Sequence, residues 1–244
     1  MNWKFVREPI AVVALTLLAA TSSAQSPVPK AVAPLGKAKL TRAAVEAKLA
    51  RLTELCQKNQ RKEVVEEFGD EDIVAWLNAF ENKAEGTSKA VNALHKRGTS
   101  FSAVGNIKRA REDFEKAIEL SPSNGHMWNS LGGVYQRMGD DGKALDAYNK
   151  AYEYDRAAHT KKSFGWMPIS ATLNAANILM GQTKYPEALK TLERYNDDDI
   201  QKMGTYWGGR MLRAYGQVYA ATGREEEAMT KFKTALERER KQDK

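Results

Sequence analysis

From about Leu40 to the end of the chain, apolar residues recur at helical spacing between short polar or glycine-containing connections. A first stripe follows Thr41, a good N-cap residue, and a second follows Asp70. The first stripe is Val45, Leu49, Leu52 and Cys56, and the second is Ile73, Val74, Trp76, Leu77 and Phe80. With only 7 Pro and 17 Gly in 244 residues, turns must be few and helices long. The pattern predicts an all-α protein whose N-terminal helices, within residues 39–88, pack over the first of the later helices.

The first 24 residues have a different pattern. Lys4 and Arg7 precede the apolar run Ile10–Ala20, and small residues follow before Gln25. This order is typical of a secretory signal peptide, and the apolar run is shorter than the roughly 20 residues that span a bilayer. We therefore expect export to the periplasm or the medium, with an uncleaved signal anchor as the alternative. Pro27, Pro29 and Pro34 make residues 25–38 an expected Pro/Ala-rich tether.

Three segments carry the same residue types at the same places. Around Trp128 the chain reads W-x2-L-G-x2-Y and then A-x3-Y-x2-A, including Gly132, Ala144 and Tyr148. The matching residues are Gly98, Phe101, Gly105, Ala110, Phe114, Ala117 and Pro122 in one segment, and Gly216, Tyr219, Gly223, Ala228, Phe232 and Ala235 in the other. Glycine at the first place lets the second helix of a pair approach closely. Gly105, Gly139 and Gly223 end the first helix, where a left-handed residue is needed.

These motifs resemble the tetratricopeptide repeat family over about 90–156 and 208–241. The resemblance implies an all-α, right-handed superhelix (solenoid) of antiparallel helix pairs. Within a repeat domain at 89–244 it implies clear repeats at 91–124, 125–158 and 209–242, and a degenerate one at about 169–202. For the degenerate repeat we expect helices Ala171–Met180 and Tyr185–Tyr195 around a longer turn. Asn174 and Asn177 would replace the usual Gly and aromatic residue.

Two further segments bear on the ends of the repeat array. Val64 and Phe68 could be remnants of another repeat, although Gly69 interrupts that helix. At the other end, the helix Glu225–Gln242 has Ala228, Met229, Phe232, Ala235 and Leu236 on one side and charged residues on the other. One apolar face and one charged face predict that this helix closes the array in water.

Composition argues against catalysis and metal binding. The single Cys56 lies in an apolar stripe and is interpreted as a core residue. The three histidines His95, His126 and His159 have no ligand partners at a metal-binding spacing, and no catalytic or nucleotide-binding motif is present. The run Asp197–Asp199 lacks the alternating ligands of a calcium loop, so we expect a solvated loop with one Asp capping a short turn at Ile200–Met203. No enzyme activity and no cofactor are expected.

The family resemblance places the partner site on the exposed side of the first helix of each repeat. In this chain those residues are Asn92, His95, Thr99, Ser102, His126, Asn129, Gln136, Arg137, Arg210, Arg213 and Gln217. Their amide and guanidinium groups can bond a peptide main chain and its carboxylates. The Lys/Asn/Arg set with which some family members bind a C-terminal carboxylate is absent, since Thr99 stands at an expected Asn.

Aromatic residues outside the repeat pattern leave two interpretations open. Phe164 and Trp166 lie in the insertion 157–168, and Tyr206-Trp207-Gly208-Gly209 opens the last repeat. They either anchor an interface or fill gaps beside the degenerate repeat. We expect Trp166 to be at least partly buried, whereas full exposure would favour the interface.

The net charge of +7 favours anionic partners at long range. The basic residues alternate with acidic ones, so no nucleic-acid partner is expected, and a secondary contact with an anionic envelope polymer or lipid is left open. The leading hypothesis is an exported, non-enzymatic module that binds a protein or peptide in the groove. The alternative is a structural subunit of a cell-envelope assembly that packs through its ends. The partner and the oligomeric state do not follow from the sequence.

Overall fold

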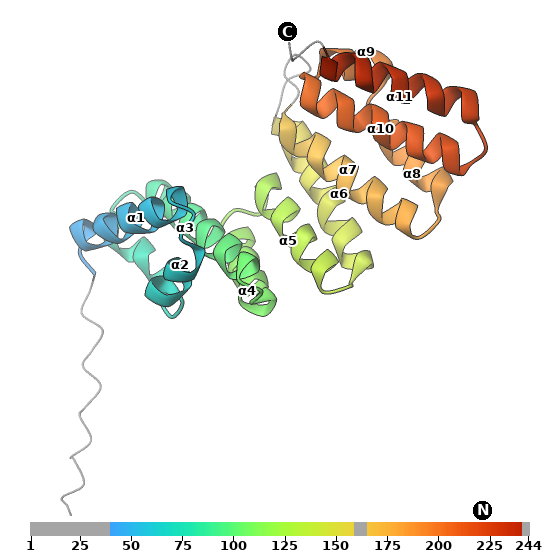
Figure 1. Cartoon of the computed structure of the whole chain (residues 1–244). Helices are drawn as coiled ribbons and strands as arrows, with labels where there is room; N and C mark the ends of the chain where they lie inside the picture. Colours follow the sequence, from blue (N-terminus) through green and yellow to red (C-terminus); the bar gives the residue numbers. More distant parts are fainter. Residues whose placement is uncertain (1–39, 159–164, 241–244) are drawn as a thin grey trace, which may run out of the picture. The chain divides into compact units, whose positions relative to one another are not determined.

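The computed structural model describes residues 40–158 and 165–240, and every regular element in these ranges is helical (Figure 1). The elements are α1 (Arg42–Gln57), α2 (Arg61–Phe68), the 3-10 helix η1 (Val74–Ala79), α3 (Lys83–Ala103), α4 (Ile107–Leu120), α5 (Gly125–Arg137), α6 (Asp141–Ala158), α7 (Trp166–Gly181), α8 (Tyr185–Leu192), α9 (Asp197–Lys202), α10 (Thr205–Ala221) and α11 (Glu225–Arg240). The expected signal peptide (1–24), tether (25–38), His159 and Phe164 lie outside the described residues.

The described helices include five hairpins with the same turn. Three residues connect the two helices, and the middle one is left-handed: Asn59 (φ 55°), Gly105 (89°), Gly139 (76°), Thr183 (58°) and Gly223 (75°). The N–H group that follows this residue donates to the carbonyl five positions earlier, at 2.8–3.0 Å in all five turns. This bond satisfies a carbonyl at the end of the first helix. The hairpins are α1–α2, α3–α4, α5–α6, α7–α8 and α10–α11.

The degenerate repeat is more regular than the sequence suggested. Because α7 continues to Gly181, the connection to α8 is no longer than the others, and the expected longer turn is wrong. Counted back from the left-handed residue, Ala176 and Leu179 stand where Gly132 and Tyr135 stand in α5. Asn174 and Asn177 therefore do not take the places of the Gly and the aromatic residue. The error arose because Thr183, a residue that rarely adopts positive φ, serves here as the turn residue.

The hairpin α1–α2 continues this pattern toward the N-terminus. Counted from Asn59, Val64 and Phe68 stand where Ala144 and Tyr148 stand after Gly139. Both side chains are buried in one core cluster with Leu94 and Phe101 of α3. Gly69 follows the last residue of α2 as its C-cap rather than interrupting a longer helix. Cys56 is half-buried and packs against the same cluster.

In three of the hairpins, α3–α4, α5–α6 and α10–α11, a glycine on the first helix meets an aromatic ring on the second. An added Cβ would lie 3.0 Å from Phe114 at Gly98, 2.7 Å from Tyr148 at Gly132 and 2.6 Å from Phe232 at Gly216. Real Cβ atoms essentially never come as close as at Gly132 and Gly216, and rarely as close as at Gly98, so Ala would push the two helices of these hairpins apart.

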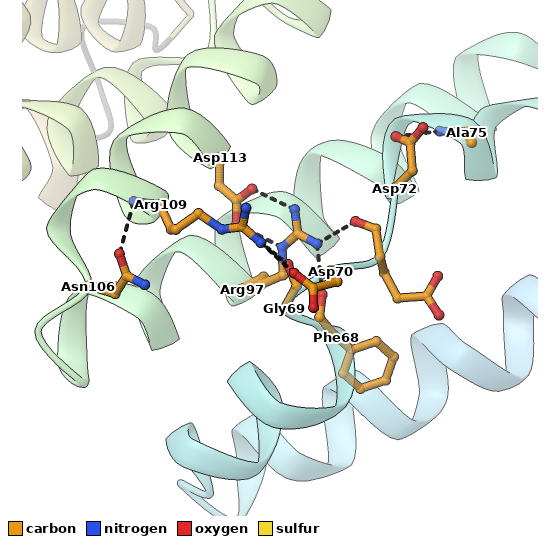
Figure 2. Close-up of polar contacts among 10 residues, drawn as sticks. Phe68, Gly69, Asp70, Asp72, Ala75, Arg97, Asn106, Arg109 and Asp113 are labelled. Carbon is orange, nitrogen blue, oxygen red and sulfur yellow. Dashed lines mark hydrogen bonds and ion pairs between the residues drawn. The ribbon is translucent and has the colours of Figure 1, made fainter. Parts of the chain in front are cut away.

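A buried arginine joins the first repeat hairpin to the N-terminal helices (Figure 2). Arg97 of α3 donates to both carboxylate oxygens of Asp113 in α4, at 2.9 and 2.7 Å. Its remaining nitrogen donates to the carbonyls of Phe68 (2.8 Å) and Glu71 (2.6 Å), at the end of α2. The Arg97 and Asp113 side chains are buried, and the bond to the Glu71 carbonyl is partly buried. The guanidinium therefore neutralises the carboxylate and also bonds the Phe68 carbonyl at the end of α2.

Near the C-terminus, the acidic run begins a helix. Asn196 is the N-cap of α9: its side-chain oxygen accepts from the Asp199 N–H, and the Asp199 carboxylate accepts from the Asn196 N–H, so the two form a capping box. The expected Asp cap on a turn at Ile200–Met203 is therefore corrected: the cap is Asn196, and the helix begins at Asp197. Asp197 and Asp198 lie in its first turn, where carboxylates are stabilised by the helix dipole.

The last helix is less covered than the sequence predicted. Ala228 and Ala235 are buried, but Met229 and Leu236 keep 55% and 54% of their surface exposed. Both were expected on the covered face. The described chain supplies no further helix beyond α11, so only the narrow Ala stripe that faces α10 is buried.

Candidate functional site

The first helices of successive repeat hairpins are joined by a row of ring contacts. His95 of α3 lies 4.3 Å from His126 of α5, measured between ring centroids. His126 meets Trp166 of α7 edge-on at 5.6 Å, and Trp166 stacks at 6.4 Å on Trp207 of α10. Tyr206 completes the row, 4.9 Å from Trp207 and nearly perpendicular to it. We call these five residues the ring row.

The ring row is exposed at its C-terminal end. Trp166 keeps 51% of its surface accessible and Tyr206 60%, whereas His95 and His126 are more covered. At 51% exposure Trp166 is partly buried, as expected, rather than fully exposed, and it contacts the rings of His126 and Trp207. Trp166 begins α7, and Tyr206 and Trp207 lie in the first turn of α10, so helix starts present these rings.

A pocket of about 380 Å³ lies beside this exposed end, between α7 and α10. Its lining residues are Leu173, Asn177, Tyr206, Arg210, Arg213, Ala214 and Gln217. The guanidinium of Arg210 lies over the rings of Trp207 (5.2 Å) and Tyr206 (5.6 Å), a cation–π arrangement. The pocket therefore combines two guanidinium groups, two amides and exposed aromatic surface.

Three of the predicted groove residues, Arg210, Arg213 and Gln217, come together in this pocket. The sequence interpretation missed Asn177 and Leu173, which line the opposite wall on α7. A signal for them existed: counted from the turn residue, Asn177 occupies the place of Gln217, and Leu173 that of Arg213. The signal was lost because the turn of the α7–α8 hairpin was placed wrongly.

The other predicted residues lie apart from this pocket. Asn92 is exposed and lines a second pocket of about 490 Å³ between α1 and α3. Gln136 accepts a hydrogen bond from the Tyr148 hydroxyl, and Arg137 donates to Ser102 of α3, so both link parts of the fold. Asn129 is half-buried, and its amide oxygen meets no donor within the described residues. Thr99 is half-buried on α3.

The two ring-row histidines are kept neutral by their surroundings. Burial is the main cause that lowers the pKa of His95 to about 4, and His126, Lys96 and Arg61 add to it. Burial also lowers the pKa of His126, against the opposing effect of Asp155. The His95 Nε2 atom lies 3.3 Å from the hydroxyl of Ser130. Neutral imidazoles of this kind pack like other aromatic rings at neutral pH.

The lowered pKa of His95 makes stability depend on pH. The unfolded chain, with a pKa near 6.5, takes up this proton more readily than the folded chain, so stability is complete above that value and falls as the pH drops toward about 4. Between pH 7 and pH 5 we expect the titration of His95 to lower the free energy of unfolding by about 2 kcal/mol. Urea unfolding of His95→Gln at both pH values should show a smaller loss than the parent chain. An equal loss in both would contradict this assignment.

Within the described residues, no three His, Cys, Asp or Glu side chains gather closely enough to hold a metal ion. None of the helices between residues 40 and 158 or between 165 and 240 is long and apolar enough to cross a membrane.

Comparison with known proteins decides the family. A family model described as Tetratricopeptide repeat matches residues 95–159 and 173–243, which are more than half of the chain. The chain belongs to the tetratricopeptide repeat family. Its helix hairpins therefore form a protein–protein interaction module, and the expected all-α solenoid is confirmed.

Individual relatives are distant. The general transcriptional corepressor trfA of Dictyostelium discoideum is 29% identical over 86 residues, which are 35% of this chain but 6% of that protein. The crystal structure of BtubC from P. vanneervenii is similar with a TM-score of 0.65, 17% identity and 82% of each chain covered. A crystal structure of MamA gives a TM-score of 0.54 at 20% identity, covering 80% of this chain and 93% of the other. At these identities the structural likeness shows the fold alone.

Proposed function

We propose that this tetratricopeptide repeat protein is an exported adaptor that holds an extended segment of a partner protein along its first helices, without catalysing a reaction. The observation that carries the proposal is the ring row, which crosses α3, α5, α7 and α10 and ends at the pocket between α7 and α10. An extended segment that follows this row would contact several repeats at once. Half-exposed aromatic rings are the usual anchors of such contacts.

The polar groups beside the row suit a peptide main chain. Asn177 of α7 and Gln217 of α10 both line the pocket and offer both donors and acceptors, as an extended segment with unpaired N–H and C=O groups requires. Export rests on the N-terminal pattern, a basic start followed by a short apolar run and small residues.

The proposal predicts that partner capture depends on the ring row. The full chain is expressed in its own cells, mildly crosslinked and recovered from the exported fraction, and its intact mass shows whether it begins at Gln25. Trp166→Ala should reduce the recovered partner about tenfold or more, because an aromatic anchor is lost. The matched control is Tyr154→Ala, which removes an exposed ring from the second helix α6. Equal capture by both variants, or recovery from the cytoplasm alone, would refute the proposal.

One observation favours the alternative of assembly through the ends. Met229 and Leu236 form an exposed apolar stripe on the terminal helix α11. If the double variant Met229→Lys, Leu236→Lys loses the partner while Trp166→Ala keeps it, the chain is a structural subunit that packs through this helix.

A further inference from the structure

In the pocket between α7 and α10, the guanidinium group of Arg210 has no carboxylate partner among the described residues. It is held over Tyr206 and Trp207 instead. Its neighbour Arg213 does pair, with Glu239 of α11. The pocket thus carries more positive than negative charge, although both arginines are partly open to solvent.

Two glycines at the start of α10 lie against the end of α11. A Cβ at Gly208 would lie 2.8 Å from the guanidinium of Arg238, whereas one at Gly209 would make an ordinary contact of 3.5 Å with the Glu239 carboxylate. Arg238 in turn donates to the carbonyls of Ile200 (2.8 Å) and Met203 (2.6 Å), which ties this part of α11 to the end of α9. The start of α10 therefore carries two rings of the ring row, and its glycines lie against the part of α11 that holds Glu239.

Resting on the proposed function, we infer that this pocket selects an acidic partner segment: a carboxylate side chain binds Arg210 and Arg213, and an adjacent apolar side chain packs on Trp166 and Tyr206. Glu239 is an internal competitor for Arg213. It shows that a carboxylate reaches this guanidinium, and a partner carboxylate must share or replace it. A basic segment is disfavoured, since it would bring like charge against both arginines.

The inference is tested with labelled dodecapeptides and the purified full chain. The acidic probe alternates Pro and Glu, and the comparison probes alternate Pro with Gln or with Lys, so that only the charge changes. Fluorescence anisotropy should show tightest binding of the acidic probe, and raising the salt from about 0.05 M to about 0.5 M should weaken it by screening. If the Gln probe binds equally well, charge selection is wrong.

Two substitutions locate the effect. Arg210→Gln should weaken binding of the acidic probe about tenfold, because a charged hydrogen-bond donor is lost, and should leave the Gln probe unchanged. Glu239→Gln should tighten the acidic probe about threefold by freeing Arg213. Glu237→Gln is the matched control, since it makes the same change of charge on α11 away from Arg213. Equal effects of Glu237→Gln and Glu239→Gln would refute the competition, and an unchanged affinity in Arg210→Gln would refute the site.

Failure of this inference is separable from failure of the proposed function. If the acidic probe does not bind but crosslinked capture still requires Trp166, the adaptor function is supported and selection of an acidic segment is wrong. If the acidic probe binds through Arg210 but capture ignores Trp166, the pocket stands and the adaptor function falls.

Discussion

Replacement of Arg97 by methionine should lower the free energy of unfolding by about 3–5 kcal/mol. The side chains of Arg97 and Asp113 retain only 6% and 3% of their accessible surface, so the substitution leaves a carboxylate without its counter-ion and out of water. It also removes the donor to the Phe68 and Glu71 carbonyls. Urea unfolding followed by circular dichroism measures the loss. Hydrogen exchange should show that α1, α2 and η1 open first.

Two further variants test the cause. Arg109, the neighbouring arginine in Figure 2, pairs with the fully exposed Asp70 and donates to the Gly69 carbonyl at 2.6 Å. Arg109→Met leaves no buried carboxylate unpaired and should cost about 1 kcal/mol, well below the loss in Arg97→Met. The double variant Arg97→Met, Asp113→Leu should recover part of the stability lost in Arg97→Met, since no unpaired carboxylate remains. A loss in Arg109→Met as large as that in Arg97→Met would show that the buried pair is not what joins these helices.

The second large effect is expected at Gly132. An alanine Cβ there would lie 2.7 Å from two ring atoms of Tyr148, which is 1% exposed and whose hydroxyl donates to Gln136. Overpacking of this kind costs about 1–3 kcal/mol, even though alanine favours a helix over glycine. Denaturant titration of Gly132→Ala should therefore show a lower midpoint with an unchanged slope.

The adjacent glycine offers a matched control. A Cβ at Gly133 meets only the Tyr148 hydroxyl, at 3.7 Å, so Gly133→Ala should be neutral or stabilise by up to about 1 kcal/mol. The double variant Gly132→Ala, Tyr148→Leu should lose less stability than the sum of the losses in the two single variants, because the smaller Leu side chain leaves room for the added Cβ. Strict additivity would mean that the ring contact does not explain the effect of Gly132→Ala.

The sequence by itself determined the three helix hairpins whose turn residue is glycine. Turn residues such as Gly139 act through their own backbone angles, and the Gly132, Ala144 and Tyr148 pattern acts within one hairpin, so both can be recognised over short stretches of chain. The same repeat register placed Arg210, Arg213 and Gln217 on one side of one helix, where the structure joins them into a pocket wall.

Where a turn lacks glycine, the sequence signal is weak. Asn59 and Thr183 adopt the same left-handed angle as Gly139, yet either residue is common in other conformations. For this reason Val64 and Phe68 only suggested a further repeat, and the structure was needed to show the α1–α2 hairpin and the regular turn of the α7–α8 hairpin.

The tertiary structure alone decided which faces are covered and which distant side chains meet. Arg97 stands in its repeat where Leu131 stands in the next, and by sequence alone it could be an exposed charge. In the structure, Asp113 and the end of α2 enclose it. The ring row joins side chains from four helices that no local pattern relates. Met229 and Leu236 look like core residues, but a side chain is buried only when a neighbouring element covers it, and the described chain places none over them.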